Sequence, residues 1–78
     1  MSKKEKLEAR IRNNPRNVSL TDYESLVKLY GHIKEGSSHP LAIIGKRVFP
    51  YRRTNPVQTP YVTKMLELID ELKNQKGM

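Results

Sequence analysis

The sequence predicts a single α+β domain in which helices cover one face of a short three-stranded sheet. Apolar residues recur at helical spacing in residues 20–30 and 59–75. Between these segments, three short apolar runs are separated by glycine-containing turns. Helices that flank a group of strands in this order are typical of the α+β class. The 78 residues leave room for one such domain, residues 1–78, with a small core.

Composition limits the functions that this domain can have. The chain has no cysteine, which excludes a disulfide scaffold, a cysteine-based zinc site and a thiol nucleophile. No apolar run approaches the roughly 20 residues that span a bilayer, and the N-terminus lacks the apolar core of a signal peptide. We therefore expect a cytoplasmic protein with no membrane partner.

Positive charge favours a polyanionic partner. Fifteen Lys and Arg residues against eight Asp and Glu give a formal charge of +7. In so small a domain this excess favours nucleic acid first. A cationic surface that only keeps the protein in solution is the simpler alternative. An anionic membrane is a weaker one, because no helix opposes a Lys/Arg face to Trp, Phe and Leu.

A short, solvated helix is expected over residues 3–14 as an N-terminal extension. Leu7 and Ile11 lie one helical turn apart among Glu, Lys and Arg, and the helix must end before Pro15.

A stronger helix is expected over residues 20–30. Ser19 can cap its N-terminus, with Asp22 three residues on. Gly31 is expected to take the left-handed position that ends it. One face carries Leu20, Tyr23, Leu26, Val27 and Tyr30.

Three strands should follow, at residues 32–36, 39–44 and 47–51. Residues 36–38 form the first turn, and Gly45 and Lys46 form the second. Pro40 and Pro50 cannot donate to a ladder, so each should lie at a strand end or on an edge strand.

The alternation of side chains along the second strand leaves two arrangements open. Along a straight strand, the side chain of His39 lies on the same side as those of Leu41 and Ile43. If His39 faces away from the helices, these two apolar side chains are exposed and await a partner. If a bulge near Pro40 shifts the parity, they belong to the core.

The last helix has the strongest signals. After a loop at residues 52–58, Thr59 is expected as the N-cap and Pro60 as the first helical residue of a helix over residues 59–75. Its buried stripe should be Val62, Met65, Leu66, Ile69 and Leu72.

Cations gather around the expected strands. They are Lys34, Lys46, Arg47, Arg52 and Arg53. Lys and Arg make charge-assisted hydrogen bonds to phosphate, so these are candidate RNA ligands. Alternatively, charges at strand ends protect an exposed sheet edge from aggregation. Tyr51 could stack on a base or bury its ring against the last helix.

His39 is the candidate acid/base in this cationic segment. RNA supplies its own nucleophile, the 2′-OH, so cleavage requires only proton transfer and stabilisation of charge on phosphate. An imidazole transfers protons at neutral pH. A polar residue at a strand start is the simpler interpretation. Metal binding is disfavoured because His32 and His39 are seven residues apart with one carboxylate, Glu35, near them.

This arrangement resembles the HicA family of bacterial toxins, which are small mRNA interferases. The family's hallmark is a Gly-Ser-x-His turn that leads into the second strand. The matching residues are Gly31, Gly36, Ser37, Ser38, His39, Gly45 and Pro50. The resemblance covers residues 19–73 and implies a fold like that of double-stranded-RNA-binding domains, α-β-β-β-α, here with an extra N-terminal helix.

The resemblance implies an endoribonuclease toxin that needs no cofactor and is neutralised by a HicB-type antitoxin protein. His39 takes the place of the family's catalytic histidine, Gly36 and Ser37 form the turn that presents it, and Ser38 contacts RNA. Two departures matter. Position 32 is His in place of an aromatic or apolar residue, and Arg52 and Arg53 stand where many relatives have a further histidine. His39 is therefore the only clear proton carrier.

Two other functions remain open from the sequence. A non-catalytic RNA-binding module would bind RNA with similar salt sensitivity but would not cleave it. A protein whose basic surface recognises only an acidic protein would show no affinity for RNA at moderate salt.

Overall fold

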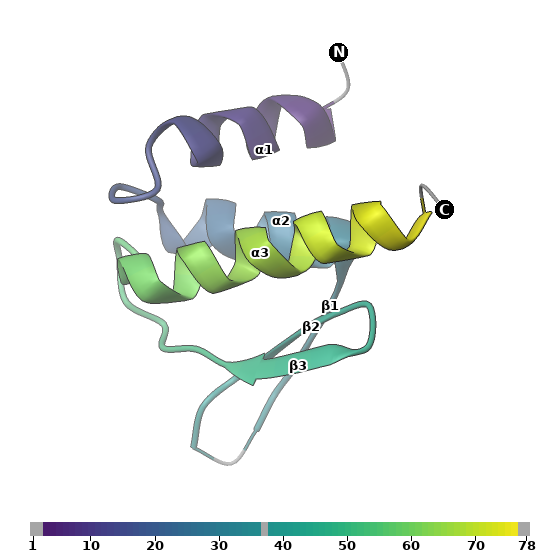
Figure 1. Cartoon of the computed structure of the whole chain (residues 1–78). Coiled ribbons are helices and arrows are strands. Elements are labelled where there is room, and N and C mark those ends of the chain that lie inside the picture. The colour runs from purple at the N-terminus through teal and green to yellow at the C-terminus, as the bar shows by residue number, and fades with distance from the viewer. Residues whose placement is uncertain (1–2, 37, 77–78) are drawn as a thin grey trace.

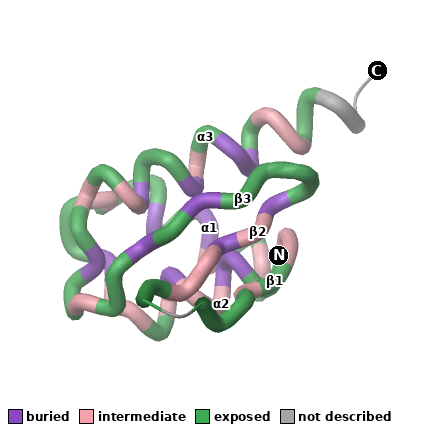
Figure 2. Tube along the Cα trace, turned by 90° about the horizontal axis from the view of Figure 1, so that it is seen from below, coloured by how far each residue is buried: buried purple, intermediate pink, exposed green. Residues whose placement is uncertain are grey.

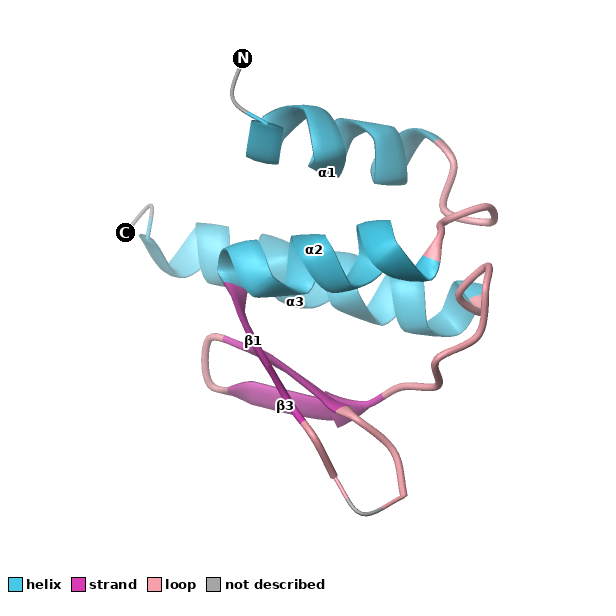
Figure 3. Ribbon diagram, turned by 180° about the vertical axis from the view of Figure 1, so that it is seen from behind, coloured by secondary structure: helices cyan, strands magenta, loops and turns pink. Residues whose placement is uncertain are grey.

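Two helices cover one face of a three-stranded antiparallel sheet, and a third helix lies across them on the side away from the sheet (Figures 1 and 3). The structure, a computed structural model, describes residues 3–36 and 38–76. Its elements are α1 (Lys3–Asn13), α2 (Leu20–Tyr30), β1 (Gly31–Lys34), β2 (Leu41–Ile44), β3 (Arg47–Pro50) and α3 (Thr59–Lys76). The predicted α+β class and the order of its elements are confirmed.

The sheet has the order β1-β2-β3, with both pairs antiparallel. Gly45 and Lys46 turn the chain between β2 and β3, and Gly45 has φ of 62°, a conformation that glycine adopts without strain. Pro40 precedes β2 and Pro50 ends the edge strand β3, as expected. All three strands are shorter than predicted: β1 ends at Lys34, β2 begins only at Leu41 because Pro40 cannot donate to the ladder, and β3 ends at Pro50.

The prediction for Gly31 is wrong. Its φ of −166° is extended, because the chain passes directly from α2 into β1 without a left-handed residue. Glycine has a different use here. A Cβ at this position would lie 1.8 Å from the carbonyl oxygen of Ile43 on the neighbouring strand, so a side chain would push β1 and β2 apart.

The two faces of the sheet differ sharply in burial. Ile33, Ala42 and Phe49 lie opposite one another, and their row faces the helices. The next row, His32, Ile43 and Val48, faces the other way, and Val48 is 56% exposed. Figure 2, which views the sheet from below, shows buried and half-buried positions alternating along β2. We call the side away from the helices the outer face.

Capping and apolar spacing explain the helices that cover the sheet. Ser19 Oγ accepts a hydrogen bond from the Asp22 amide at 3.1 Å, so the predicted cap of α2 is confirmed. On α2 itself, Tyr23, Leu26 and Val27 are buried, while Leu20 and Tyr30 are partly buried.

The stripe predicted for α3 needs correction. Val62, Met65 and Ile69 are buried as expected, but Leu68 is buried too, and Leu66 and Leu72 are only partly buried. The buried face is therefore centred further toward Leu68 than the spacing suggested. The helix also includes Thr59, the residue expected to cap it.

Candidate functional site

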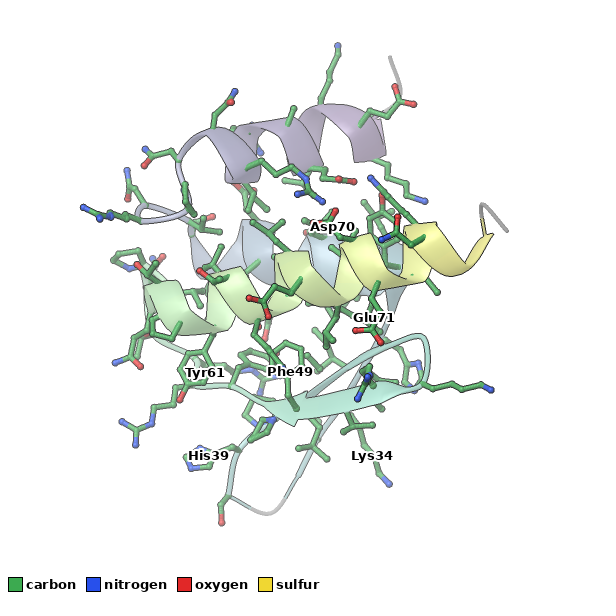
Figure 4. All side chains as sticks on the ribbon, in the orientation of Figure 1. Lys34, His39, Phe49, Tyr61, Asp70 and Glu71 are labelled. Carbon is green, nitrogen blue, oxygen red and sulfur yellow. The ribbon has the colours of Figure 1, made fainter. Side chains whose placement is uncertain are left out.

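His39 lies on the outer face, just before β2 begins at Leu41. Its side chain is exposed and makes no hydrogen bond or ion pair with the residues that the structure describes. Figure 4 shows His39 and Lys34 on the side of the sheet opposite the helices. An imidazole held in this way is open to solvent and to a large ligand.

The register of the strands determines what surrounds His39. Leu41 pairs with Pro50, and the Tyr51 amide donates to the Pro40 carbonyl at 3.2 Å. His39 and Arg52 are the next residues beyond this contact, so both lie at the same end of the sheet. The same alternation puts Lys34 beside Leu41 on the outer face. The strand ends thus bring an imidazole and two cations to one edge of an open surface.

The structure decides between the two arrangements of the second strand. Ala42 and Ile44 are in the core, so Leu41 and Ile43 are on the outer face with His39, where they are half-buried by their neighbours. With Val48 they form an apolar strip along the sheet. The interpretation in which His39 faces outward is therefore correct, and no bulge is needed.

The five candidate cations fall into two groups. Lys34, Lys46 and Arg52 are exposed and have no hydrogen-bond or ion-pair partner among the described residues. They are free to meet an anion. The guanidinium of Arg47 instead donates to Glu71 on α3, with nitrogen–oxygen distances of 3.1 and 2.9 Å.

Arg53 is bound more fully to carboxylates. Its Nε donates to Glu24 Oε2 on α2 at 2.9 Å, and its two terminal nitrogens donate to the two oxygens of Glu35 at 2.9 and 2.6 Å. These hydrogen bonds, with Glu35 the larger contributor, raise the pKa of Arg53 above its already high value. Arg53 therefore lies in an ion-pair network, and it has fewer donors left for phosphate than Arg52.

Tyr51 is unsuited to stacking on a base. Its ring is 1% exposed, and it packs against Tyr23 of α2 with ring centroids 5.0 Å apart. Its hydroxyl donates to Glu24. Of the two interpretations, burial is correct, with α2 supplying the aromatic contact.

The Gly-Ser-Ser-His turn is described in part. Ser37 lies outside the described residues, and Ser38 is exposed next to His39. Gly36 has a steric role, since a Cβ there would lie 2.4 Å from the carbonyl oxygen of His39. The backbone at Gly36 and His39 therefore approaches too closely for a side chain at position 36 without a shift.

Sequence reasoning missed the two carboxylates, Glu24 and Glu35, that connect this region to the helices. Glu24 lies in α2 and Glu35 follows β1, so no helical or strand periodicity relates them to Arg53. The signal in the sequence is slight: Glu35 is an isolated acid in a basic segment.

The described residues contain no group of three or more His, Cys, Asp or Glu side chains that could hold a metal ion. Among the same residues, no helix is long and apolar enough to cross a membrane. What the site offers is an accessible imidazole, free cations and an apolar strip. These groups can transfer a proton, neutralise phosphate and bury apolar surface of a partner.

No protein-family model, curated protein or solved structure matches the chain. The resemblance to HicA toxins therefore rests on the motif residues and their order.

Proposed function

We propose that this protein is a metal-independent endoribonuclease, the toxin of a toxin–antitoxin pair, with His39 as general acid/base. The observation that carries the proposal is the exposed imidazole of His39, which has no partner among the described residues and lies on the same open side of the sheet as Lys34 (Figure 4). Arg52 is exposed at the same end of the sheet. This setting agrees with the role that the HicA-like Gly-Ser-Ser-His turn implies.

The proposed reaction requires little of the protein. The 2′-OH of the RNA attacks the adjacent phosphorus as His39 removes its proton, and the bond to the 5′-oxygen breaks as that oxygen gains a proton. The products are a 2′,3′-cyclic phosphate and a 5′-hydroxyl. Lys34 and Arg52 would stabilise the charge that develops on the phosphate oxygens. Lys46, at the β2–β3 turn, would bind the sugar-phosphate backbone further along the RNA.

The outer face also supports the proposal of an antitoxin partner. Leu41, Ile43 and Val48 form an apolar strip that RNA does not require, and the cations at its edge would attract an acidic protein. A HicB-type antitoxin bound there would cover His39 and prevent access of RNA.

A second candidate function is an RNA-binding module without catalysis. It is favoured by one observation: among the described residues, no second group that could act as an acid or base contacts the imidazole of His39. In this case, the cations would hold RNA and His39 would be one more polar contact.

Cleavage separates the two functions. Total RNA should be degraded by the wild type in EDTA, and His39→Gln should abolish degradation while RNA binding and the folded state persist. A general acid/base is worth roughly 10²–10⁴-fold in rate. His32→Gln is the matched control, because His32 is also on the outer face but in the middle of β1. RNA binding by a wild type that does not degrade RNA would favour the RNA-binding module. Continued degradation by the His39 variant, or loss of wild-type activity in EDTA, would rule out the metal-independent mechanism through His39.

A further inference from the structure

The ion-pair network of Arg53 connects the helix layer to the segment that carries His39. Glu24 belongs to α2, whereas Glu35 directly follows β1 and lies four residues before His39. The guanidinium bridges the two carboxylates through three hydrogen bonds of 2.6 to 2.9 Å. One side chain thus ties the start of the β1–β2 connection to the helices.

The helix end of this bridge is firmly held. Glu24 Oε2 also accepts a hydrogen bond from the Tyr51 hydroxyl, and the Tyr51 ring is buried against Tyr23. Because Tyr51 precedes Arg53 by two residues, the chain that carries the guanidinium is fixed by the core. Arg53 therefore starts from a fixed point and reaches outward to Glu35.

The other end of the bridge bears directly on His39. Gly36 follows Glu35, and its Cα is so close to the backbone of His39 that a Cβ would lie 2.4 Å from the His39 carbonyl oxygen. On the opposite side, the Pro40 carbonyl accepts from the Tyr51 amide. The backbone around His39 is therefore close to Gly36 on one side and to Tyr51 on the other. Gly36 is the neighbour of Glu35, which is the partner of Arg53.

Charge argues against phosphate as the main ligand of Arg53. The positive charges of Arg53 and of the nearby Lys28 are balanced by the negative charges of Glu24 and Glu35, so the cluster offers an approaching phosphate no excess positive charge. Hydrogen bonds from Arg53 lower the pKa of Glu35, which therefore stays ionised at neutral pH. Exposed ion pairs contribute little to stability unless they are bidentate or part of a network, and this one is both.

We propose that Arg53 is a positioning residue, which fixes the backbone at His39 by holding Glu35 against the helix layer. This inference rests on the proposed ribonuclease function, and it changes the expected role of Arg53 from phosphate ligand to support. Arg52, one residue earlier and without a side-chain partner in the described part of the chain, remains the proposed phosphate ligand.

Glu35→Gln separates positioning from phosphate binding, because the two roles predict opposite effects. If Arg53 positions His39, the loss of the bidentate pair should lower kcat by roughly tenfold to a hundredfold, with KM nearly unchanged. If Arg53 binds phosphate, removing a competing carboxylate should strengthen RNA binding and leave kcat intact. Glu67→Gln on α3 makes the same change in net charge at an exposed site without an ion pair in the described structure, and should do neither.

Arg53→Lys and Arg52→Lys extend the comparison. Lysine keeps the charge but cannot form the fork that bridges two carboxylates. Arg53→Lys should therefore reduce kcat as Glu35→Gln does. The double variant Glu35→Gln/Arg53→Lys should have a kcat no lower than that of either single variant. Arg52→Lys, at the proposed phosphate ligand, should weaken RNA binding, whereas Arg53→Lys should leave RNA binding nearly unchanged. Equal kcat in wild type and Arg53→Lys, or additive losses in the double variant, would overturn the positioning role.

A measurement without RNA keeps the inference separate from the proposed function. The order parameter of the His39 backbone amide, measured by NMR relaxation, should fall in Glu35→Gln and not in Glu67→Gln. This result is readable even if the wild type cleaves no RNA. An unchanged order parameter at His39 would contradict the positioning role, whatever the activity.

Discussion

Glu8 on α1 is a buried carboxylate that holds all three helices together. It accepts hydrogen bonds from Arg12, from Lys73 on α3 at 2.6 Å and from the Tyr30 hydroxyl at the end of α2. Burial raises the pKa of Glu8, but the hydrogen bonds from Lys73, Tyr30 and Arg12 together outweigh it and lower the pKa from 4.5 to about 2. The folded state therefore favours the ionised carboxylate.

This shift predicts a loss of stability in acid. The contribution of Glu8 is complete above pH 4.5 and disappears as the pH falls toward 2, because protonation then occurs in both folded and unfolded chains. Glu8→Gln should lower the free energy of unfolding at pH 7 by on the order of 3 kcal/mol and have little effect near pH 2. Urea titrations at both pH values measure this, with Glu67→Gln as control. An equal loss at pH 7 and pH 2 would mean that Glu8 acts through packing.

The free cations predict a second result at the scale of single residues. Lys34→Gln and Arg52→Gln should each reduce the slope of log K against log salt by about 1, because each removes a phosphate contact. Lys3→Gln on α1 and Lys64→Gln on α3 remove the same charge from helix surfaces and should change the slope less. RNA-binding titrations at several salt concentrations would show this. Similar slopes for all four variants would mean that net charge governs binding.

At this scale, the sequence could predict the candidates but not their partners. His39 stood out as a single imidazole behind a Gly-Ser-Ser turn, and its outward direction followed once Ala42 and Ile44 were known to be buried. The difference between Arg52 and Arg53 was not predictable. It depends on Glu24, which lies 29 positions away and is brought near Arg53 only by the packing of α2 on the sheet.

At the scale of elements, the helices could be predicted from the sequence, because caps, prolines and apolar spacing act within one turn. Which side chains of each helix are buried could not be predicted in full. Leu68 is 5% exposed and Leu66 only partly buried, because the orientation of α3 is set by β2 and α2, which lie far away in sequence. The close contact at Gly31 was missed for the same reason.

The orientation of α3 predicts a difference between neighbouring side chains. Ile69→Ala should lower the free energy of unfolding by ~2–5 kcal/mol, since the side chain is fully buried and leaves a cavity. Leu66→Ala should cost clearly less, because part of the Leu66 side chain is already in contact with water. Thermal or urea unfolding of both variants tests this. A larger loss for Leu66→Ala than for Ile69→Ala would mean that α3 is rotated from the orientation described here.

At the scale of the whole molecule, the helices take up one face of the sheet and leave the other open (Figure 3). The class and the element order were predictable because helical and strand patterns occupy separate segments of the chain. The layered arrangement of α1 was not, because it depends on Glu8, Tyr30 and Lys73 meeting across three helices. The open face is the surface on which we propose that RNA binds.

We propose that His39 transfers a proton in an attack by the RNA's own 2′-OH, so cleavage requires this hydroxyl. The most direct measurement uses a short RNA whose cleavage site has been mapped, and the same RNA with a single 2′-deoxy nucleotide at that site, both in EDTA. The wild type should cleave the first RNA and leave the second intact. Cleavage of the 2′-deoxy substrate at the same position would contradict the proposed attack by the 2′-OH.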